Sequence, residues 1–165
     1  MTDESRRGSL LEDLARALRE RGWRCVTAES CTGGGVARAL TELPGSSVWF
    51  ERGFVTYSNE SKQEMLGVSP ETIERFGAVS EETAREMAEG ALRHGHGQIA
   101  VAVSGVAGPS GGSADKPVGT VVFAWAIRDG GTTTRVRQFD GGRGDIRSAS
   151  VFQALEGLLA RLRER

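Results

Sequence analysis

The sequence predicts an α/β protein, a three-layer α/β/α sandwich with a mixed central sheet. Several segments carry apolar residues at helical spacing, and they alternate with short apolar runs that are typical of buried strands. Two such runs flank the turn signal Asp129-Gly130-Gly131 near the C-terminus. Alternating helices and strands indicate a layered sheet, and the hairpin makes that sheet mixed. The 165 residues suit one compact domain spanning 1–165.

The N-terminal part is expected to form a helix, a strand and a second helix. Ser9 makes a capping box with Glu12, and Gly22 ends the first helix. An apolar run then predicts a short buried strand over Trp23–Ala28. Helical spacing returns over Thr32–Leu43, before the helix breakers proline and glycine.

The middle of the chain is expected to hold one strand and then several helices. The segment Val48–Tyr57 is rich in β-branched and aromatic residues, which predicts a strand with an irregularity at Gly53. A short helix follows over Asn59–Leu66. Another helix opens with Pro70 in its first turn, and Ser80 caps a longer helix.

The C-terminal part completes the sheet. A continuous apolar run over Ile99–Val103 predicts a strand buried on both faces. A glycine-rich loop follows, and the segments Val118–Ile127 and Thr132–Phe139 form the expected hairpin. Asp145 is expected to cap the last helix.

The composition is that of a soluble globular protein, with 38% hydrophobic and 26% charged residues. The net charge of −1 gives no overall field that would attract nucleic acid or an anionic membrane. No apolar run reaches the ~18 residues of a membrane span, and the N-terminus lacks a hydrophobic signal core. Cys25 and Cys31 match neither a metal-ligand spacing nor a disulfide framework. We therefore expect a cytoplasmic protein.

The first candidate site is the segment ESCTGGG at residues 29–35, between a predicted strand and a predicted helix. A serine oxygen that becomes anionic near a helix N-terminus is stabilised by the unpaired N–H groups there. Ser30 is therefore a candidate nucleophile, and the glycines would let a substrate approach the backbone. On local sequence alone, Ser30 or Thr32 is better explained as an N-cap. Cys31 competes as nucleophile, but it lacks a histidine partner and core packing explains it better.

A serine nucleophile needs a base. The only histidines, His94 and His96, lie at the predicted end of a helix, which disfavours a Ser-His-Asp triad. Arginine stays protonated, so Lys62 and Lys116, the only lysines, are the candidates. Lys62 follows a polar strand end and would need burial to lower its pKa from about 10.4 towards 7–8. A surface lysine is the alternative interpretation.

The second candidate site is the glycine-rich loop at residues 104–119. It follows a buried strand, and the ends of such strands are where α/β sheets bind ligands. Successive backbone N–H groups in this loop can form a nest for an anion. The loop matches neither a nucleoside-triphosphate P-loop nor a dinucleotide-binding fingerprint. A long turn explains it as well as a phosphate site does.

Several motifs occur in order from about Arg21 to the final helix. They are TAESCTGG at 27–34, PGSS at 44–47, FERGFVTYSN at 50–59, GAVS at 77–80, SGVAGP at 104–109 and KPVGT at 116–120. In this combination the chain resembles the CinA C-terminal-domain family. The resemblance covers nearly the whole chain, and it implies the fold expected above.

The resemblance also implies the stand-alone form of a nicotinamide-nucleotide amidase, which converts nicotinamide mononucleotide and water to nicotinate mononucleotide and ammonia. It places the nucleophile at Ser30, the catalytic lysine at Lys62, and a hydroxyl relay or orienter at Tyr57. The positions that it assigns to substrate binding are Cys31, Thr32, Gly33, Gly34, Ser104, Gly105, Gly108, Arg143 and Arg147, with the two arginines suited to the phosphate. A small molecule is the expected partner, together with a second copy of the chain in a homo-oligomer, with a dimer favoured.

In the expected mechanism, neutral Lys62 takes the proton of Ser30, which attacks the carboxamide carbon. The N–H groups after Ser30 stabilise the oxyanion, and a proton returns through Lys62 or Tyr57. No cofactor is expected, and no metal, because the candidate ligands are scattered and lack a zinc spacing. Two alternatives stay open. One is a non-catalytic nucleotide- or partner-binding module of the same fold, and the other is an amidohydrolase of another small amide.

Overall fold

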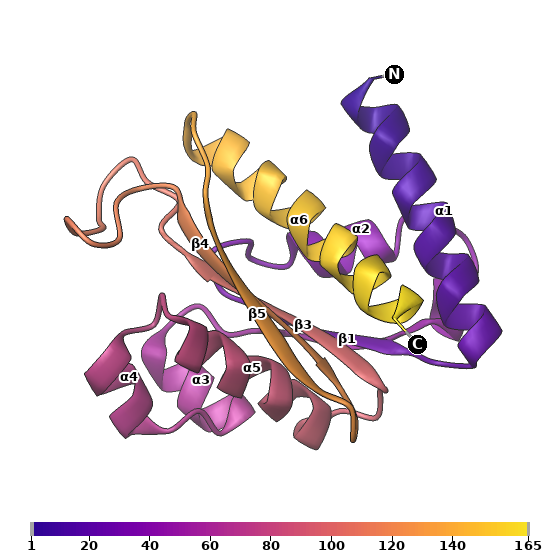
Figure 1. The fold of residues 1–165 in the computed structure, drawn as a ribbon, viewed down its shortest axis with the longest axis horizontal. Helices are drawn as coiled ribbons and strands as arrows, with labels where there is room; N and C mark the ends of the chain where they lie inside the picture. Colours follow the sequence, from indigo (N-terminus) through magenta and orange to yellow (C-terminus); the bar gives the residue numbers. More distant parts are fainter. Residues whose placement is uncertain (1, 165) are drawn as a thin grey trace.

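A mixed five-stranded sheet lies at the centre of the structure, a computed structural model that describes residues 2–164 (Figure 1). The strands are β1 (Cys25–Glu29), β2 (Phe50–Val55), β3 (Ile99–Gly105), β4 (Thr120–Ile127) and β5 (Gly131–Gln138). Their order is β2-β1-β3-β4-β5. The first three strands are mutually parallel, whereas β4 and β5 join antiparallel, so the predicted mixed sheet is confirmed.

Helices cover both faces of this sheet (Figure 1). They are α1 (Asp3–Arg21), α2 (Gly35–Leu40), α3 (Asn59–Leu66), α4 (Pro70–Phe76), α5 (Glu81–His94) and α6 (Arg143–Arg163), with a short 3-10 turn η1 (Ser46–Val48). Helices α1, α2 and α6 bury one hydrophobic core against the sheet, and α3, α4 and α5 bury a second core on the opposite face. The three-layer α/β/α sandwich predicted from the sequence is therefore confirmed.

The predicted boundaries hold best for the helices between β2 and β3. Helix α3 has the predicted bounds, Asn59–Leu66, and α4 begins with Pro70. Ser80 caps α5 by accepting the N–H of Thr83 on its Oγ at 3.2 Å. Polar caps and a first-turn proline are local signals, which explains why they could be read from the sequence.

The starts of α1 and α6 differ from the prediction. Thr2 caps α1 by accepting the N–H of Ser5 at 3.1 Å, so the capping box at Ser9 is wrong and Ser9 lies inside the helix. The cap at Asp145 is also wrong, because Asp145 lies in the first turn of α6. Its Oδ2 accepts the N–H of Gly142 at 2.9 Å, one residue before the helix.

Helix α2 is shorter than the predicted Thr32–Leu43. Gly33 and Gly34 adopt φ angles of +57° and +100°, in the left-handed region, so the helix begins only after them. The predicted irregularity at Gly53 is also misplaced. The register between β1 and β2 shifts between Cys25 and Val26, which puts the extra residue of β2 at Glu51.

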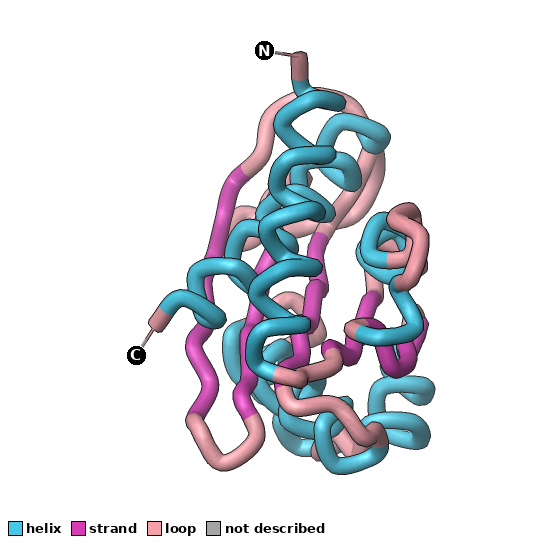
Figure 2. The backbone as a smooth tube through the Cα atoms, turned by 90° about the vertical axis from the view of Figure 1, so that its right-hand side faces the viewer, coloured by secondary structure: helices cyan, strands magenta, loops and turns pink. Residues whose placement is uncertain are grey.

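The hairpin at the end of the sheet matches the prediction. Strands β4 and β5 are joined by a short turn, visible as the pink loop at the lower left of Figure 2. Asp129 has a φ of +60° there, and the N–H of Gly130 donates to the carbonyl of Ile127 at 2.9 Å. Aspartate tolerates this left-handed conformation better than most residues do.

Helix α6 approaches the sheet closely at Gly157. This contact predicts that two glycine-to-alanine substitutions in the same helix affect the stability of the protein differently. A Cβ atom added at Gly157 would overlap the indole ring of Trp125, whose Nε1 donates to the carbonyl of Ala154 at 3.0 Å. Gly157→Ala should therefore lower the free energy of unfolding by about 1–3 kcal/mol. The matched variant Gly144→Ala, in open space on the same helix, should raise it by up to about 1 kcal/mol. Urea denaturation measures both, and equal stabilities of the two variants would contradict this packing.

Candidate active site

The candidate residues gather at the C-terminal ends of the three parallel strands. Ser30 follows β1, and its N–H donates to the carbonyl of Val103 in β3 at 2.9 Å. The N–H of Thr56, just after β2, donates to the carbonyl of Glu29 at 2.8 Å. The chain leaves β1 towards α2 on one face and leaves β2 towards α3 on the other (Figure 1). Adjacent parallel strands with helices on opposite faces create the crevice in which α/β proteins bind ligands.

Ser30 and Lys62 are in direct contact in this crevice. Lys62 Nζ lies 3.0 Å from Ser30 Oγ. It also donates to the carbonyls of Thr56 at 2.8 Å and Tyr57 at 3.3 Å. Lys62 is 1% exposed, and Ser30 is 8% exposed. The lysine that the sequence left open as a surface residue is thus buried against the candidate nucleophile.

The surroundings of Lys62 make the neutral amine more accessible than in a solvated lysine. Burial lowers the pKa of Lys62 from its ordinary value of 10.5 to about 8. No salt bridge involves this lysine within residues 2–164. A neutral amine has two N–H groups and one lone pair. It can donate to the carbonyls of Thr56 and Tyr57 and accept the hydroxyl proton of Ser30, which is the geometry a general base requires.

The competing nucleophile and the other possible bases lie in unsuitable places. Burial raises the pKa of the Cys31 thiol to about 11, so it stays protonated near neutral pH. His94 ends α5, and the N–H of His96 donates to Glu51, near the start of β2. This is the end of the sheet opposite Ser30. Ser30 and Lys62 are therefore the candidate nucleophile and base that the geometry brings together.

Glu29 is a site residue that the sequence analysis did not single out. Alternate residues of a strand face opposite sides of its sheet, so Glu29 faces α2 while Ser30 faces α3. The buried carboxylate of Glu29 accepts the hydroxyl of Thr32 at 2.6 Å. It also accepts the first free amides of α2, those of Val36 at 2.7 Å and Ala37 at 3.1 Å. Its position directly before the candidate nucleophile was the one sequence feature that could have identified Glu29.

This carboxylate changes the interpretation of the first glycine-rich loop. Gly34 is the N-cap of α2, and the N-cap interpretation of Ser30 and Thr32 is wrong. The N-terminal amides of α2 are occupied by Glu29 and are not available to an oxyanion. The N–H groups of Cys31 and Thr32 have no acceptor within residues 2–164. Together with the N–H of Gly34, they are the donors of this loop that the fold leaves free within the same residues.

The second glycine-rich loop lies beside this crevice, and several of its polar groups bind the protein itself. Ser104 is buried and donates to the carbonyl of Ala78 at 2.8 Å. Gly105 packs so closely on β4 that an added Cβ would lie 2.9 Å from the carbonyl oxygen of Thr120. Lys116 Nζ donates to the carbonyl of Phe76, at the end of α4, at 2.7 Å. These contacts give the loop a structural role in addition to any ligand.

Tyr57 and Arg143 meet at the exposed rim of the site. The carbonyl of Tyr57 contacts Lys62, but its phenol is 60% exposed and its hydroxyl accepts from Arg143 Nη2 at 3.1 Å. Arg143 Nη1 donates to the carbonyl of Gly108 at 2.7 Å, which links α6 to the second loop. The expected relay hydroxyl thus contacts an arginine, and no hydrogen bond joins it to Ser30 or Lys62 within residues 2–164.

Arg147 is directed at the first loop. Its Nε donates to the carbonyl of Cys31 at 3.1 Å, and its Nη2 lies 3.5 Å from the carbonyl of Thr32. A Cβ atom added at Gly33 would lie 3.2 Å from Arg147 Nη2. The small glycine, at positive φ, therefore lets a guanidinium from α6 lie against the loop.

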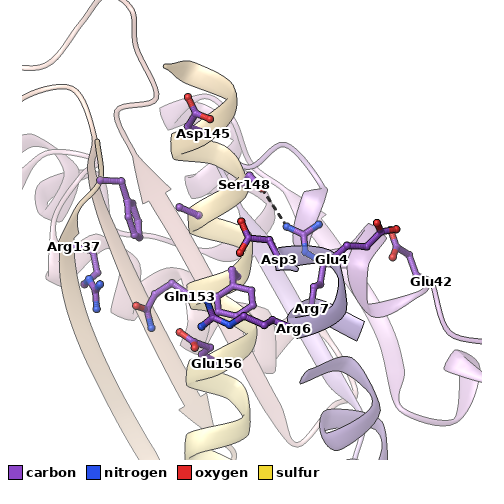
Figure 3. Close-up of a pocket in the computed structure, with 13 residues that line it drawn as sticks. Asp3, Glu4, Arg6, Arg7, Glu42, Arg137, Asp145, Ser148, Gln153 and Glu156 are labelled. Carbon is purple, nitrogen blue, oxygen red and sulfur yellow. Dashed lines mark hydrogen bonds between the residues drawn. The ribbon is translucent and has the colours of Figure 1, made fainter. Parts of the chain in front are cut away.

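A surface cavity of about 680 Å³ lies elsewhere, between the start of α1, the outer flank of α6 and the end of β5 (Figure 3). Its lining includes Asp3, Arg6, Arg137, Phe152 and Gln153, and none of the predicted site residues.

Residues 2–164 contain no group of three or more His, Cys, Asp or Glu side chains placed to hold a metal ion. Over the same residues, no helix is both long enough and apolar enough to cross a bilayer.

Comparison with known proteins identifies close relatives. The sequence matches the CinA C-terminal domain family over residues 7–162. It is 53% identical over 150 residues to the nicotinamide-nucleotide amidohydrolase PncC of Enterobacter agglomerans, covering 90% of this chain and 92% of the relative. The protein of the same name from Escherichia coli strain K12 is 52% identical over 158 residues, covering 96% and 95%. The crystal structure of the competence/damage inducible protein CihA from Agrobacterium tumefaciens superposes with a TM-score of 0.87 at 50% identity, covering 94% of this chain and 96% of that chain.

The contacts of Glu29 predict a specific loss of stability. Glu29→Gln replaces one acceptor oxygen with a donor group that faces the backbone N–H groups of α2. The free energy of unfolding should fall by about 1.5–3 kcal/mol, the contribution of a charged hydrogen bond. Glu74→Gln, on the exposed side of α4, is the matched control and should change little. Urea denaturation at pH 7 tests this, and a Glu29→Gln protein as stable as the control would contradict the assignment.

Proposed function

Because the chain belongs to the CinA C-terminal domain family, we propose that it is a nicotinamide-nucleotide amidohydrolase whose nucleophile is Ser30 and whose base is Lys62. The 3.0 Å contact between Lys62 Nζ and Ser30 Oγ is the observation that carries the mechanism. The names of the relatives supply a nicotinamide nucleotide as the substrate. The proposed substrate is nicotinamide mononucleotide, and the products are nicotinate mononucleotide and ammonia.

Acylation starts with the neutral amine of Lys62. The amine takes the proton of Ser30, and Ser30 Oγ forms a bond to the carboxamide carbon. The carbonyl oxygen becomes an oxyanion, stabilised by the free N–H groups of Cys31 and Thr32. The Lys62 ammonium then gives its proton to the amide nitrogen, the carbon–nitrogen bond breaks, and ammonia leaves. The product of this half-reaction is an ester on Ser30.

Deacylation reverses these roles with water. Neutral Lys62 takes a proton from a water molecule, whose oxygen attacks the ester carbon. The bond to Ser30 Oγ breaks, Oγ regains the proton from Lys62, and the free carboxylic acid ionises to nicotinate mononucleotide. The carbonyls of Thr56 and Tyr57 hold the amine in place throughout, since both accept from its N–H groups.

Arg143 is the proposed phosphate ligand. It is exposed at the rim of the crevice, and its contacts with Tyr57 and Gly108 hold its guanidinium between the two sides of the site. A guanidinium presents paired donors that match a phosphate group. Tyr57 is then an orienting residue that acts through its hydroxyl on Arg143, and Lys62 alone moves the protons.

A non-catalytic binding module would not explain the buried lysine. Keeping Lys62 protonated at neutral pH costs about 3 kcal/mol, given the distance of its pKa from 10.5. A scaffold would be more stable with an apolar residue there. This cost is expected of a group whose neutral form is needed for proton transfer.

Two further proposals concern the state of the protein. We propose a cytoplasmic location, supported by two cysteines, Cys25 and Cys31, that are both buried and unpaired.

We also propose a homo-oligomer, with a dimer favoured. Sedimentation equilibrium tests the second proposal, and a monomer at micromolar concentration would contradict it.

A direct assay tests the proposed function. The pure protein should release ammonia and nicotinate mononucleotide in equal amounts from nicotinamide mononucleotide. Free nicotinamide should react much more slowly, because the phosphate contributes to orientation of the carboxamide. Equal rates on the two compounds would contradict the proposed role of the phosphate in binding. Turnover of another small amide, with none of the mononucleotide, would contradict the proposed substrate.

The pKa of Lys62 predicts the pH dependence. Only the neutral amine can take the proton of Ser30, so kcat/KM should rise with pH through an apparent pKa of about 8. Well below this pH, activity should fall about tenfold per pH unit, as the fraction of neutral amine does. The measurement is kcat/KM between pH 6 and 9.5 on protein shown to be folded throughout. A profile that is flat across this range would contradict the assignment of Lys62 as the base.

A further inference from the structure

The two arginines at the start of α6 make different kinds of contact. Arg143 is exposed and contacts Gly108 and Tyr57 at the rim. Arg147 is half-buried and directs Nε and Nη2 at two successive carbonyls of the nucleophile loop, those of Cys31 and Thr32. Two nitrogens of its guanidinium are thus engaged by the backbone, and a phosphate would have to compete for them.

The contact with Cys31 fixes the direction of a peptide group. In a trans peptide, the carbonyl of one residue and the N–H of the next point in opposite directions. Because the Cys31 carbonyl points at Arg147, the Thr32 N–H points to the other side of the loop. That N–H has no acceptor within residues 2–164. It is one of the donors proposed above for the oxyanion.

Two side chains, the buried Glu29 and the half-buried Arg147, therefore both hold the loop. Glu29 binds the hydroxyl of Thr32 and the amides at the start of α2. Arg147 binds the carbonyls of Cys31 and Thr32, where the small Gly33 leaves room for its guanidinium. The contact joins residues 116 positions apart in the sequence, so α6 determines the orientation of the peptide next to the nucleophile.

Building on the proposed amidase function, we propose that Arg147 is a positioning residue that orients the Thr32 N–H for the oxyanion, and that it is not a ligand of the substrate phosphate. This assigns Arg143 and Arg147 to different steps. Arg143 contributes to binding of the nucleotide, whereas Arg147 contributes to the rate of acylation and deacylation without touching the substrate.

A comparison of Arg147→Ala with Arg143→Ala on two substrates separates these roles. The substrates are nicotinamide mononucleotide and nicotinamide riboside, which lacks the phosphate. Arg147→Ala should lower kcat at least about tenfold on both, as loss of alignment does, with KM for the mononucleotide within about threefold of wild type. Arg143→Ala should instead raise KM for the mononucleotide, because it removes the proposed phosphate ligand. An Arg147→Ala protein with raised KM for the mononucleotide, normal kcat and unchanged activity on the riboside would overturn the inference.

A second variant covers the case in which Arg147→Ala does not fold. Arg147→Lys keeps the charge and the aliphatic stem, but an ammonium cannot span two successive carbonyls as a planar guanidinium does. It should also lose kcat at nearly unchanged KM on both substrates. A folded Arg147→Lys protein with wild-type kcat would overturn the positioning role.

Labelling of Ser30 by a fluorophosphonate tests the same point without the natural substrate. Ser30 Oγ forms a bond to phosphorus, the phosphorus–fluorine bond breaks, fluoride leaves, and Lys62 takes the hydroxyl proton. The labelling rate should fall at least about tenfold in Arg147→Ala and stay near wild type in the matched control Arg163→Ala, at the exposed far end of the same helix. An equal rate in Arg147→Ala and wild type would overturn the inference. A wild-type protein that is labelled but does not hydrolyse the mononucleotide would refute only the proposed function, and one that does neither would refute both.

Discussion

The burial of one amine against one hydroxyl is the constraint on which the rest of the site depends. Lys62 is enclosed, its pKa is lowered to about 8, and the only hydrogen-bond partners of its side-chain amine within residues 2–164 are Ser30 Oγ and two main-chain carbonyls. Desolvation of a charged lysine is unfavourable, so the surroundings shift the equilibrium towards the neutral form. A serine beside a neutral amine can lose its proton near neutral pH, and this makes an acyl-transfer reaction possible without histidine.

The sheet topology brings these two groups together. Strands β1 and β2 are parallel neighbours, so the residues that follow them emerge at the same edge of the sheet. The chain turns to opposite faces after the two strands, towards α2 after β1 and towards α3 after β2 (Figure 1). This is the arrangement at which α/β sheets bind ligands. The alternation of β1 then sends Glu29 to the α2 side and Ser30 to the α3 side. The carboxylate of Glu29 fixes the loop, and the hydroxyl of the next residue, Ser30, is free to react.

The order of the helices and strands could be predicted from local patterns in the sequence. Local pattern and scarcity made Ser30 and Lys62 candidates, but on these alone an N-cap and a surface lysine were the better explanations, and the resemblance to the CinA C-terminal-domain family selected the pair. Ser30 follows a buried strand, and Lys62 is one of only two lysines. The roles of Glu29 and Arg147 could not be predicted in this way. Glu29 has partners up to eight positions away across a turn with positive φ angles, and Arg147 binds backbone carbonyls of a distant loop. Contacts of this kind depend on tertiary packing. The position of Glu29 directly before Ser30 marked it as a candidate, but residue types alone do not give the partners of Glu29 or Arg147.

The most direct test of the Ser30–Lys62 unit is the turnover number of single and double variants on nicotinamide mononucleotide, each first shown to be folded by circular dichroism. Ser30→Ala and Lys62→Arg should each nearly abolish kcat, since arginine keeps the charge but cannot act as a base. The double variant should be hardly slower than either single one, because the two groups act in the same steps. A folded Lys62→Arg protein with near-normal kcat would contradict the account.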